Sequence, residues 1–285
     1  MEGLSADAGA VTVLCGFAGG LTLGFAARWG RFCTLKAIED AALGSDFSGL
    51  RIWGVAIAVA IGGTHALDHA GLIDVSESFY IASPMSLIAT VIGGLVFGLG
   101  IALVGTCGFG TLARMGGGDL KSVVTFLIIG ISAYATLRGA TAYVRVALFS
   151  GPEQRETPAS FAHSVEAAAG LSFHVTAYTI AALLLVVCLS SRSFRGQHKK
   201  VLIGALVGLV IVWGWISTGV LAADDFDPYP LESYSFSAPL GETVIYEMTM
   251  SGSSLKFGIG AVTGVVGGVA ATSLFPGDFS LEERY

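Results

Sequence analysis

Seven segments of this chain contain no Asp, Glu, Lys or Arg and are close to the length that crosses a lipid bilayer. A hydrocarbon core about 30 Å thick requires about 20 apolar residues in one helix. The chain is 53% hydrophobic and 13% charged, whereas soluble domains are about 25% charged. We therefore predict an all-α integral membrane protein, built as a polytopic helical bundle. The segments are Ala10–Ala27, Ile52–Leu67, Pro84–Thr106, Ser122–Leu137, Ala167–Ser191, Val201–Ala223 and Phe257–Gly277.

The composition argues against several other classes of protein. The net charge of −6 is unfavourable for a nucleic-acid partner, which requires a clustered basic face. The four cysteines lack the spacing and the neighbouring histidines of a metal cluster or a disulfide framework. We expect no metal ion, no cofactor and no enzyme activity. Met1–Gly9 carries Glu2 and Asp7 but no basic residue, so we expect a first span rather than a cleaved signal peptide.

The connections between the apolar segments alternate in charge. Arg192–Lys200 has four basic residues and no acidic one, and Arg28–Arg51 has four basic residues against three acidic ones. Asp68–Glu77 has three acidic residues, Asp224–Glu247 has six, and neither has a basic one, while Arg138–Glu166 is mixed. Cytoplasmic loops are enriched in Lys and Arg. We therefore predict seven spans in the inner (cytoplasmic) membrane of the cell, with the N-terminus outside.

Two stretches differ from ordinary spans and loops. Ser78–Ala113 has no charge over 36 residues, which is too long for one helix and too short for two helices with a polar turn. Phe32–Ala42 is half-apolar and is followed by Gly44. Each pattern fits a full span followed by a short helix that re-enters the membrane, where it would line a cavity or pack within protein. A long tilted helix followed by an interfacial helix fits equally well.

The first half of the chain contains an internal repeat without gaps. Gly19–Gly24 and Gly93–Gly98 both begin with Gly-Gly-Leu and place another Gly five residues after the first. Cys33 and Cys107 both lie fourteen residues after that first Gly. Glycines let membrane helices approach closely, which explains them without a function. A cysteine in the same register twice indicates a duplication, and many transporters are built by duplication, with a site between the repeats.

The repeat suggests three parts of the chain. Residues 1–150 form a first repeat half with both cysteine-bearing elements, and 151–200 form a connection with one span and the basic loop. Residues 201–285 form a second half that is expected to be incomplete. In that half Trp213–Gly219 is similar to the first element, with Ser217 and Thr218 near the position of a cysteine, and Gly258–Gly268 is similar to the start of the second.

The surroundings of the two cysteines resemble a known family. Cys33 and Gly105–Gly110, with Arg114 and Gly116–Gly118 downstream, are similar to the YeeE/YedE-type sulphur-transport proteins, which are proposed to take up thiosulfate. Lys256–Gly264 is similar to the second half of that family. The resemblance implies an hourglass-shaped bundle of two pseudo-symmetric halves, with short helices that narrow its middle. Cysteine thiols at the constriction would pass the substrate across.

The resemblance matches Cys33 and Cys107 to two of the family's central cysteines. It places a third in a Gly-Cys segment after the Gly-rich helix of the second half, which is expected from a longer form, a partner chain or a homo-oligomer. Neutral thiols are soft contacts for the terminal sulfur of an anion, and two nearby arginines would attract the anion. The expected substrate-binding residues are Cys33, Cys107, Gly108, Arg31 and Arg114.

The leading interpretation is a permease for a small sulfur-containing anion such as thiosulfate. One alternative is a membrane thiol–disulfide protein, although neither cysteine has a C-x-x-C partner. Another is a non-transporting subunit that completes a homologous transporter. Cys15 and Cys188 are expected to be small buried hydrophobic residues. His65 and His174 lie in or beside spans and fit either proton coupling or neutral packing.

Overall fold

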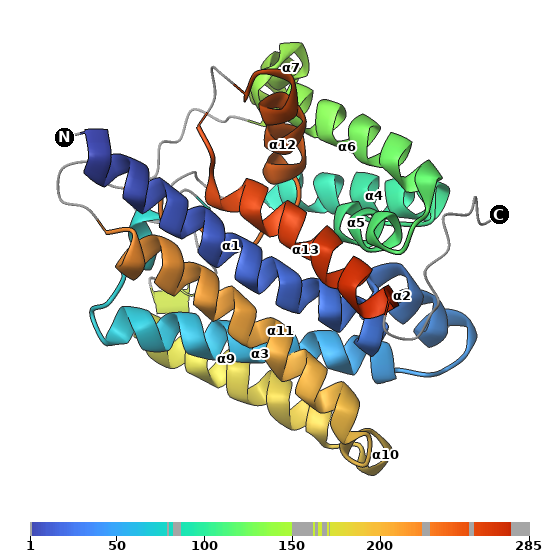
Figure 1. The fold of residues 1–285 in the computed structure, drawn as a ribbon. Helices are drawn as coiled ribbons and strands as arrows, with labels where there is room; N and C mark the ends of the chain where they lie inside the picture. The colour runs from blue at the N-terminus through green and yellow to red at the C-terminus, as the bar shows by residue number, and fades with distance from the viewer. Residues whose placement is uncertain are drawn as a thin grey trace.

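The computed structural model describes residues 2–78, 80–81, 87–149, 162, 165–166, 170, 172–223, 229–250 and 254–274, and the regular elements among them are helical (Figure 1). The first part contains α1 (Glu2–Gly30), α2 (Thr34–Leu43), α3 (Ser48–His69), the 3₁₀ turn η1 (Val75–Glu77), α4 (Leu87–Val104), α5 (Gly108–Gly116), α6 (Leu120–Arg138) and α7 (Ala140–Phe149). The second contains α9 (Phe173–Leu189), α10 (Arg192–Arg195), α11 (His198–Ile216), the π-helical turn η2 (Ser217–Leu221), α12 (Ala238–Met248) and α13 (Phe257–Leu274).

The long helices confirm an all-α polytopic membrane protein. Six helical stretches of the described chain are long and apolar enough to cross a bilayer, and they coincide with six of the seven predicted spans. The remaining predicted span falls on α9, whose 17 residues give a length of about 26 Å. α3 and α6 are longer than predicted, with 22 and 19 residues. Three predicted limits, Pro84, Ala167 and Gly277, lie outside the described residues.

The closest helix pair joins α1 to α13, which lie side by side in Figure 1. The contact surface of α1 carries Gly16, Gly20 and Gly24, spaced four residues apart like the facing glycines of α13. A Cβ atom added at Gly20 would lie 3.0 Å from the Cα atom of Gly264, and one at Gly24 would lie 3.1 Å from that of Gly268. Residue numbers rise together along the contact, so the two helices run parallel. The glycine-rich sequence therefore serves close helix packing, as predicted.

Three further helices, α11, α3 and α9, extend the layer formed by α1 and α13. α11 packs on α3 through Gly204 and Gly208, whose added Cβ atoms would lie 3.1 Å and 2.7 Å from the Cβ atoms of Val55 and Val59. α9 packs on the opposite side of α3 from α11 and is visible as the yellow helix at the edge of the bundle (Figure 1). α12 stands across this layer and packs on both α6 and α13.

The first half repeats at the level of helices as well as residues. A long helix, a short helix and another long helix follow one another twice, as α1–α3 and then as α4–α6. Ser48 begins α3, and Ser122 lies in the first turn of α6. The spacing from Cys33 to Ser48 is the same as that from Cys107 to Ser122. Both serines are buried. Both copies therefore contain the long helix and the short helix that the sequence predicted, while the re-entry of the short helices into the membrane stays a prediction.

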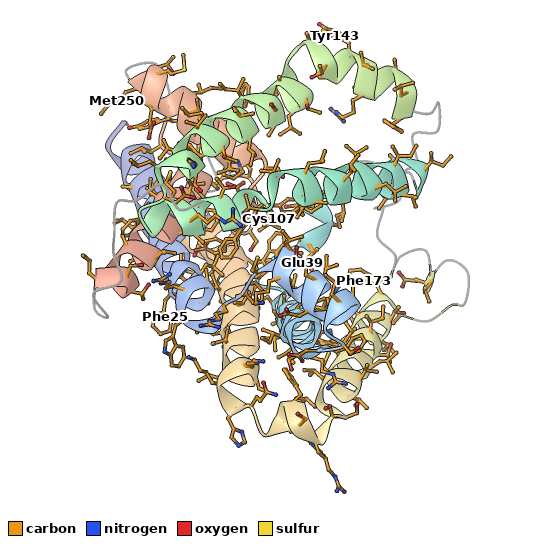
Figure 2. All side chains as sticks on the ribbon, turned by 90° about the vertical axis from the view of Figure 1, so that its right-hand side faces the viewer. Phe25, Glu39, Cys107, Tyr143, Phe173 and Met250 are labelled. Carbon is orange, nitrogen blue, oxygen red and sulfur yellow. The ribbon has the colours of Figure 1, made fainter. Side chains whose placement is uncertain are left out.

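α4 differs from its counterpart α1 in its surroundings. In the most apolar part of the stretch Ile88–Gly116, which begins within α4, 6% of the residues are buried, compared with 39% in that of the stretch Gly9–Leu43, which begins within α1. Figure 2 shows α4 projecting from the bundle beyond Cys107. Gly93, Gly94 and Gly98 have no described atom within 4 Å of an added Cβ. Among the described residues, none packs on the glycines of α4 in the way that α13 packs on those of α1.

Candidate functional site

Two helix breaks with the same backbone pattern carry the repeated cysteines. In the first, Arg31 has a left-handed φ of 50° and Cys33 is extended, with φ −140° and ψ 129°. In the second, Gly105 has a φ of 74° and Cys107 is extended, with φ −98° and ψ 176°. A left-handed residue two positions before an extended cysteine ends the long helix and turns the chain. Each cysteine then occupies the N-cap position of a short helix, α2 or α5.

Cys33 lies in a groove of about 240 Å³ on the side of the bundle that carries the basic loop. Arg31, Lys36 and Lys200 line the groove with Asp40 and Asp46, and the Lys36 ammonium forms an ion pair of 3.1 Å with Asp40. Lys200 belongs to the basic connection Arg192–Lys200, and Arg31 belongs to the other one. The two connections that the sequence places on the cytoplasmic side therefore meet at one end of the molecule.

The side chain of Cys107 is fixed by a capping hydrogen bond that Cys33 lacks. Its sulfur accepts a hydrogen bond of 3.4 Å from the Gly110 amide, whereas Cys33 makes no such cap bond. Arg114, in the last turn of α5, donates from Nη2 to the Gly105 carbonyl over 2.6 Å. This hydrogen bond links the C-terminal end of α5 to the helix break that precedes it. An added Cβ at Gly108 would lie 2.9 Å from Leu240 Cδ1 and 3.1 Å from the Phe236 carbonyl, so a side chain at the start of α5 would require these neighbours to shift.

An aromatic row connects the two breaks. The ring of Phe32, directly before Cys33, lies 6.4 Å from that of Phe109 in an edge-to-face arrangement. Phe32 also contacts Trp53 of α3 at 4.3 Å, and Phe109 contacts Phe236 at 5.2 Å. These four residues were not among the predicted site residues, although two of them flank the cysteines in sequence. The row places both cysteine-bearing turns at one aromatic cluster within the bundle.

Residues 229–237, the described connection that leads into α12, pack onto the bundle beside this cluster. The Tyr234 hydroxyl donates to the carbonyls of Cys15 and Gly16 over 3.0 and 3.2 Å. Tyr229 accepts from the Phe257 amide over 2.9 Å and donates to the Glu232 carboxylate over 3.3 Å. Burial, and then the nearby charge of Glu242, raises the pKa of Glu232 to about 7. This connection is therefore part of the packed protein rather than an exposed loop.

The remaining predicted positions have structural roles or differ from expectation. α11 continues into η2 without a break, and the buried Ser217 and Thr218 donate to the carbonyls of Trp213 and Gly214. The second half thus lacks a cysteine-type break at this position. All four cysteines are free thiols, with Cys188 buried as expected and Cys15 only half-buried.

Six long apolar helices among the described residues define a polytopic membrane protein, and two helix breaks within it share one backbone pattern. The chain belongs to the sulphur-transport family, whose model matches residues 29–284. It is similar to the thiosulfate transporter TsuA of Spirochaeta thermophila, with 28% identity over 224 residues, which are 70% of this chain and 66% of that protein. It is also similar to the thiosulfate transporter TsuA of Escherichia coli, with 32% identity over 177 residues, which are 62% of this chain and 46% of that protein. The matches thus span less than two thirds of either relative.

Proposed function

We propose that this protein transports a small sulfur-containing anion, such as thiosulfate, across the inner membrane. The observation that carries the proposal is the repeated break, which places Cys33 and Cys107 at the N-caps of two short helices beside one aromatic cluster. The two relatives named as thiosulfate transporters support the same substrate class.

The two turns offer complementary contacts to such an anion. The first amides of α2 and α5 have no partners within their helices and carry partial positive charge, which suits anionic oxygens. A neutral thiol is a soft, weak donor that suits the terminal sulfur and releases it easily. A thiolate would repel the anion, so the proposal requires protonated Cys33 and Cys107. Phe32 and Phe109 would exclude water where the anion passes.

The charged residues near the breaks take different roles in this proposal. Arg31 and Lys200 line the groove that contains Cys33, where they would attract the anion at the cytoplasmic end. Arg114 would act indirectly, because its guanidinium already binds the Gly105 carbonyl and so fixes the turn that presents Cys107. Gly108 would keep the start of α5 free of a side chain. With α1 and α13 parallel, this scheme has both running from the outside to the cytoplasm.

The test is uptake of radiolabelled thiosulfate by cells that lack other thiosulfate transporters. Cys33→Ser and Cys107→Ser keep a small polar group but lose the sulfur, and each is expected to lower uptake about tenfold or more, equal to roughly 1.4 kcal/mol. Cys188→Ser is the matched control, because that thiol is buried against Gly54 of α3. Wild-type uptake by both break variants, at equal protein levels, would refute the cysteine mechanism.

The same cells distinguish the thiol–disulfide alternative. In that case a Cys33–Cys107 disulfide would form and be reduced during activity, and mass analysis without reductant would detect it. A permease keeps both thiols free throughout uptake, as they are in the structure.

The open surface of α4 favours a role for a second chain. Gly94 is the repeat counterpart of Gly20, yet no described atom approaches it. We propose that a glycine-rich helix of another chain, either a further copy or a homologous subunit, packs on α4 as α13 packs on α1. Gly94→Leu is then expected to prevent co-purification of differently tagged chains and to abolish uptake. An unchanged assembly and unchanged uptake would refute the packing of a partner chain on α4.

A further inference from the structure

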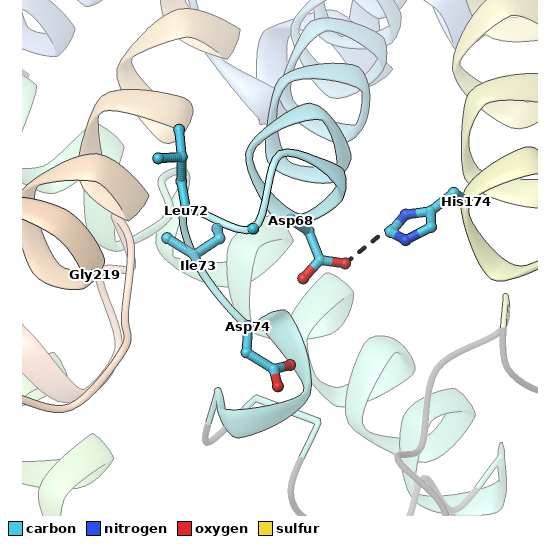
Figure 3. A pocket seen from close by; sticks show the side chains of 7 residues that line it. Asp68, Leu72, Ile73, Asp74, His174 and Gly219 are labelled. Atoms are coloured by element: carbon cyan, nitrogen blue, oxygen red, sulfur yellow. Dashed lines mark ion pairs between the residues drawn. The ribbon is translucent and has the colours of Figure 1, made fainter.

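Three of the five histidines of the chain gather where the C-terminal end of α3 meets the start of α9. His65 and His69 belong to α3, and His174 belongs to α9. Asp68, also on α3, points its carboxylate at the His174 ring (Figure 3). This cluster lies at the opposite end of α3 from the break that carries Cys33, so the proposed transport site does not account for it.

The donor atoms of His65, Asp68 and His174 are close enough to share one ion. One ligand atom from each lies within 4.8 Å of the others, and His174 Nδ1 is 3.8 Å from Asp68 Oδ2. Tetrahedral zinc with bonds of about 2.0–2.2 Å holds its ligand atoms roughly 3.4 Å apart. Small side-chain rotations, which move the ligand atoms by up to about 1 Å each, would bring them to this spacing.

The surroundings prepare two of these side chains for a ligand. Asp68 Oδ1 accepts a hydrogen bond of 3.1 Å from the Val75 amide, which orients the carboxylate and leaves Oδ2 toward His174. Such outer contacts are typical of metal-binding side chains. The Nδ1 atom of His174 is buried and has no hydrogen-bond partner. A buried polar atom without a partner is costly, and a metal ion would satisfy it.

The cluster also has an access path. A groove of about 500 Å³ is lined by Asp68 and His174 together with Asp74, Gly219 and the connecting residues 71–73 (Figure 3). Asp74 is engaged in capping η1, where its carboxylate accepts from the Ser76 amide over 2.9 Å. It therefore adds negative charge to the groove without being placed as a ligand.

We propose that His65, Asp68 and His174 form a binding site for a divalent transition-metal ion, with zinc as the best fit. Two imidazole nitrogens and one carboxylate oxygen match the ligands that zinc prefers, while calcium and magnesium prefer oxygen alone. Three protein ligands leave a fourth position, which faces the groove and takes water or an anion. Although the cysteine pattern suggested no metal, His65 and Asp68 share one helix face through their spacing of three residues.

The site would fasten α9 to the bundle. α9 packs mainly on α3, and among the described elements its next most extensive contact is with α10, at its far end. An ion held by two residues of α3 and one of α9 would cross-link the two helices near Phe173, whose ring packs on His65 at 4.6 Å. Metal binding stabilises the folded state by mass action, so this cross-link makes stability depend on zinc.

The experiment is zinc titration of the full chain, purified in detergent without a histidine tag, followed by calorimetry and by thermal unfolding. One ion per chain and a raised melting temperature, reversed by chelator, are expected. His174→Gln and Asp68→Asn should each weaken zinc binding at least about tenfold to hundredfold. His198→Gln, on an exposed histidine at the start of α11, is the matched control and should bind like the wild type.

Cobalt substitution keeps the test independent of variant folding. The cobalt complex of the wild type should show a tetrahedral visible spectrum without a thiolate charge-transfer band, and Cys33→Ser/Cys107→Ser should bind equally. A thiolate band, or equal zinc affinity in His174→Gln and His198→Gln, would overturn the proposal. Failure of this site would leave the transport proposal untouched, since uptake is not part of the measurement.

Discussion

The glycine contact between α1 and α13 allows a quantitative prediction at Gly264. A Cβ atom added there would lie 3.0 Å from Gly20 Cα and 3.0 Å from the Leu21 amide nitrogen, and closer still to the Phe17 carbonyl. Carbon atoms pack best at about 3.5–4.0 Å, so Gly264→Ala must push the helices apart by roughly 0.5–1 Å. Such a gap removes a quarter to a half of the dispersion attraction across the contact.

Gly267 provides the matched control on the same helix. Its added Cβ would lie 3.4 Å from the flexible end of Leu21 and 3.9 Å from the Phe17 ring, which is ordinary contact. Both substitutions gain the same helix propensity, about 1 kcal/mol. The difference between Gly264→Ala and Gly267→Ala therefore isolates the cost of overpacking, expected at about 1–3 kcal/mol.

The assay is unfolding in mixed micelles titrated with SDS, with helix content followed by circular dichroism. Gly267→Ala should unfold at the same or a higher SDS fraction than the wild type, and Gly264→Ala at a clearly lower one. Equal unfolding of the two variants would refute the close parallel contact. Because α1 leads directly into the break at Cys33, Gly264→Ala should also reduce thiosulfate uptake, while Gly267→Ala should not.

Three further outcomes follow from individual contacts. The pKa of Glu232 is raised from 4.5 to about 7, so the folded protein holds a proton that the unfolded chain releases, and stability should fall as pH rises through this window. Glu232→Gln should remove that decline in melting temperatures measured from pH 5 to 8; an unchanged slope would contradict the assignment. Arg114→Gln should lose the bond to the Gly105 carbonyl and lower uptake while leaving thiosulfate binding at the cytoplasmic groove intact; loss of both would indicate direct contact with the anion. Tyr234→Phe should destabilise the protein by about 1 kcal/mol, measured by SDS titration, because its hydroxyl holds the Cys15 carbonyl; no change would show that ring packing alone fixes the connection.

The sequence located six long apolar helices correctly because their signals are local, whereas α7 and α12 lie in segments that it assigned to connections. Apolar length without charge identifies a span, and the shared register of Cys33 and Cys107 identifies a duplicated element. Both breaks occur where the repeat places them, and their common backbone pattern explains why a glycine stands at 105. Arg31 occupies the same left-handed position in the first copy, which sequence alone does not reveal because the residue types differ.

Contacts between distant parts of the chain could not be predicted in the same way. The spacing of glycines indicated close packing but did not identify α13 as the partner of α1. The aromatic row depends on how two turns meet in space, so Phe32 and Phe109 carried no signal beyond their proximity to the cysteines. His174 is brought to Asp68 by the packing of α9 on α3, and the sequence left its role open between proton coupling and packing.

The parallel contact of α1 with α13 has a consequence for how the protein is made. α1 is synthesised before every other described helix, and its closest partner, α13, emerges after all the others that the structure describes. During translation the glycine surface of α1 therefore contacts lipid or a temporary neighbour. Its small residues provide little contact area until a second helix packs closely on them. Among the described helices, the closest contact therefore forms last, after α13 has entered the membrane.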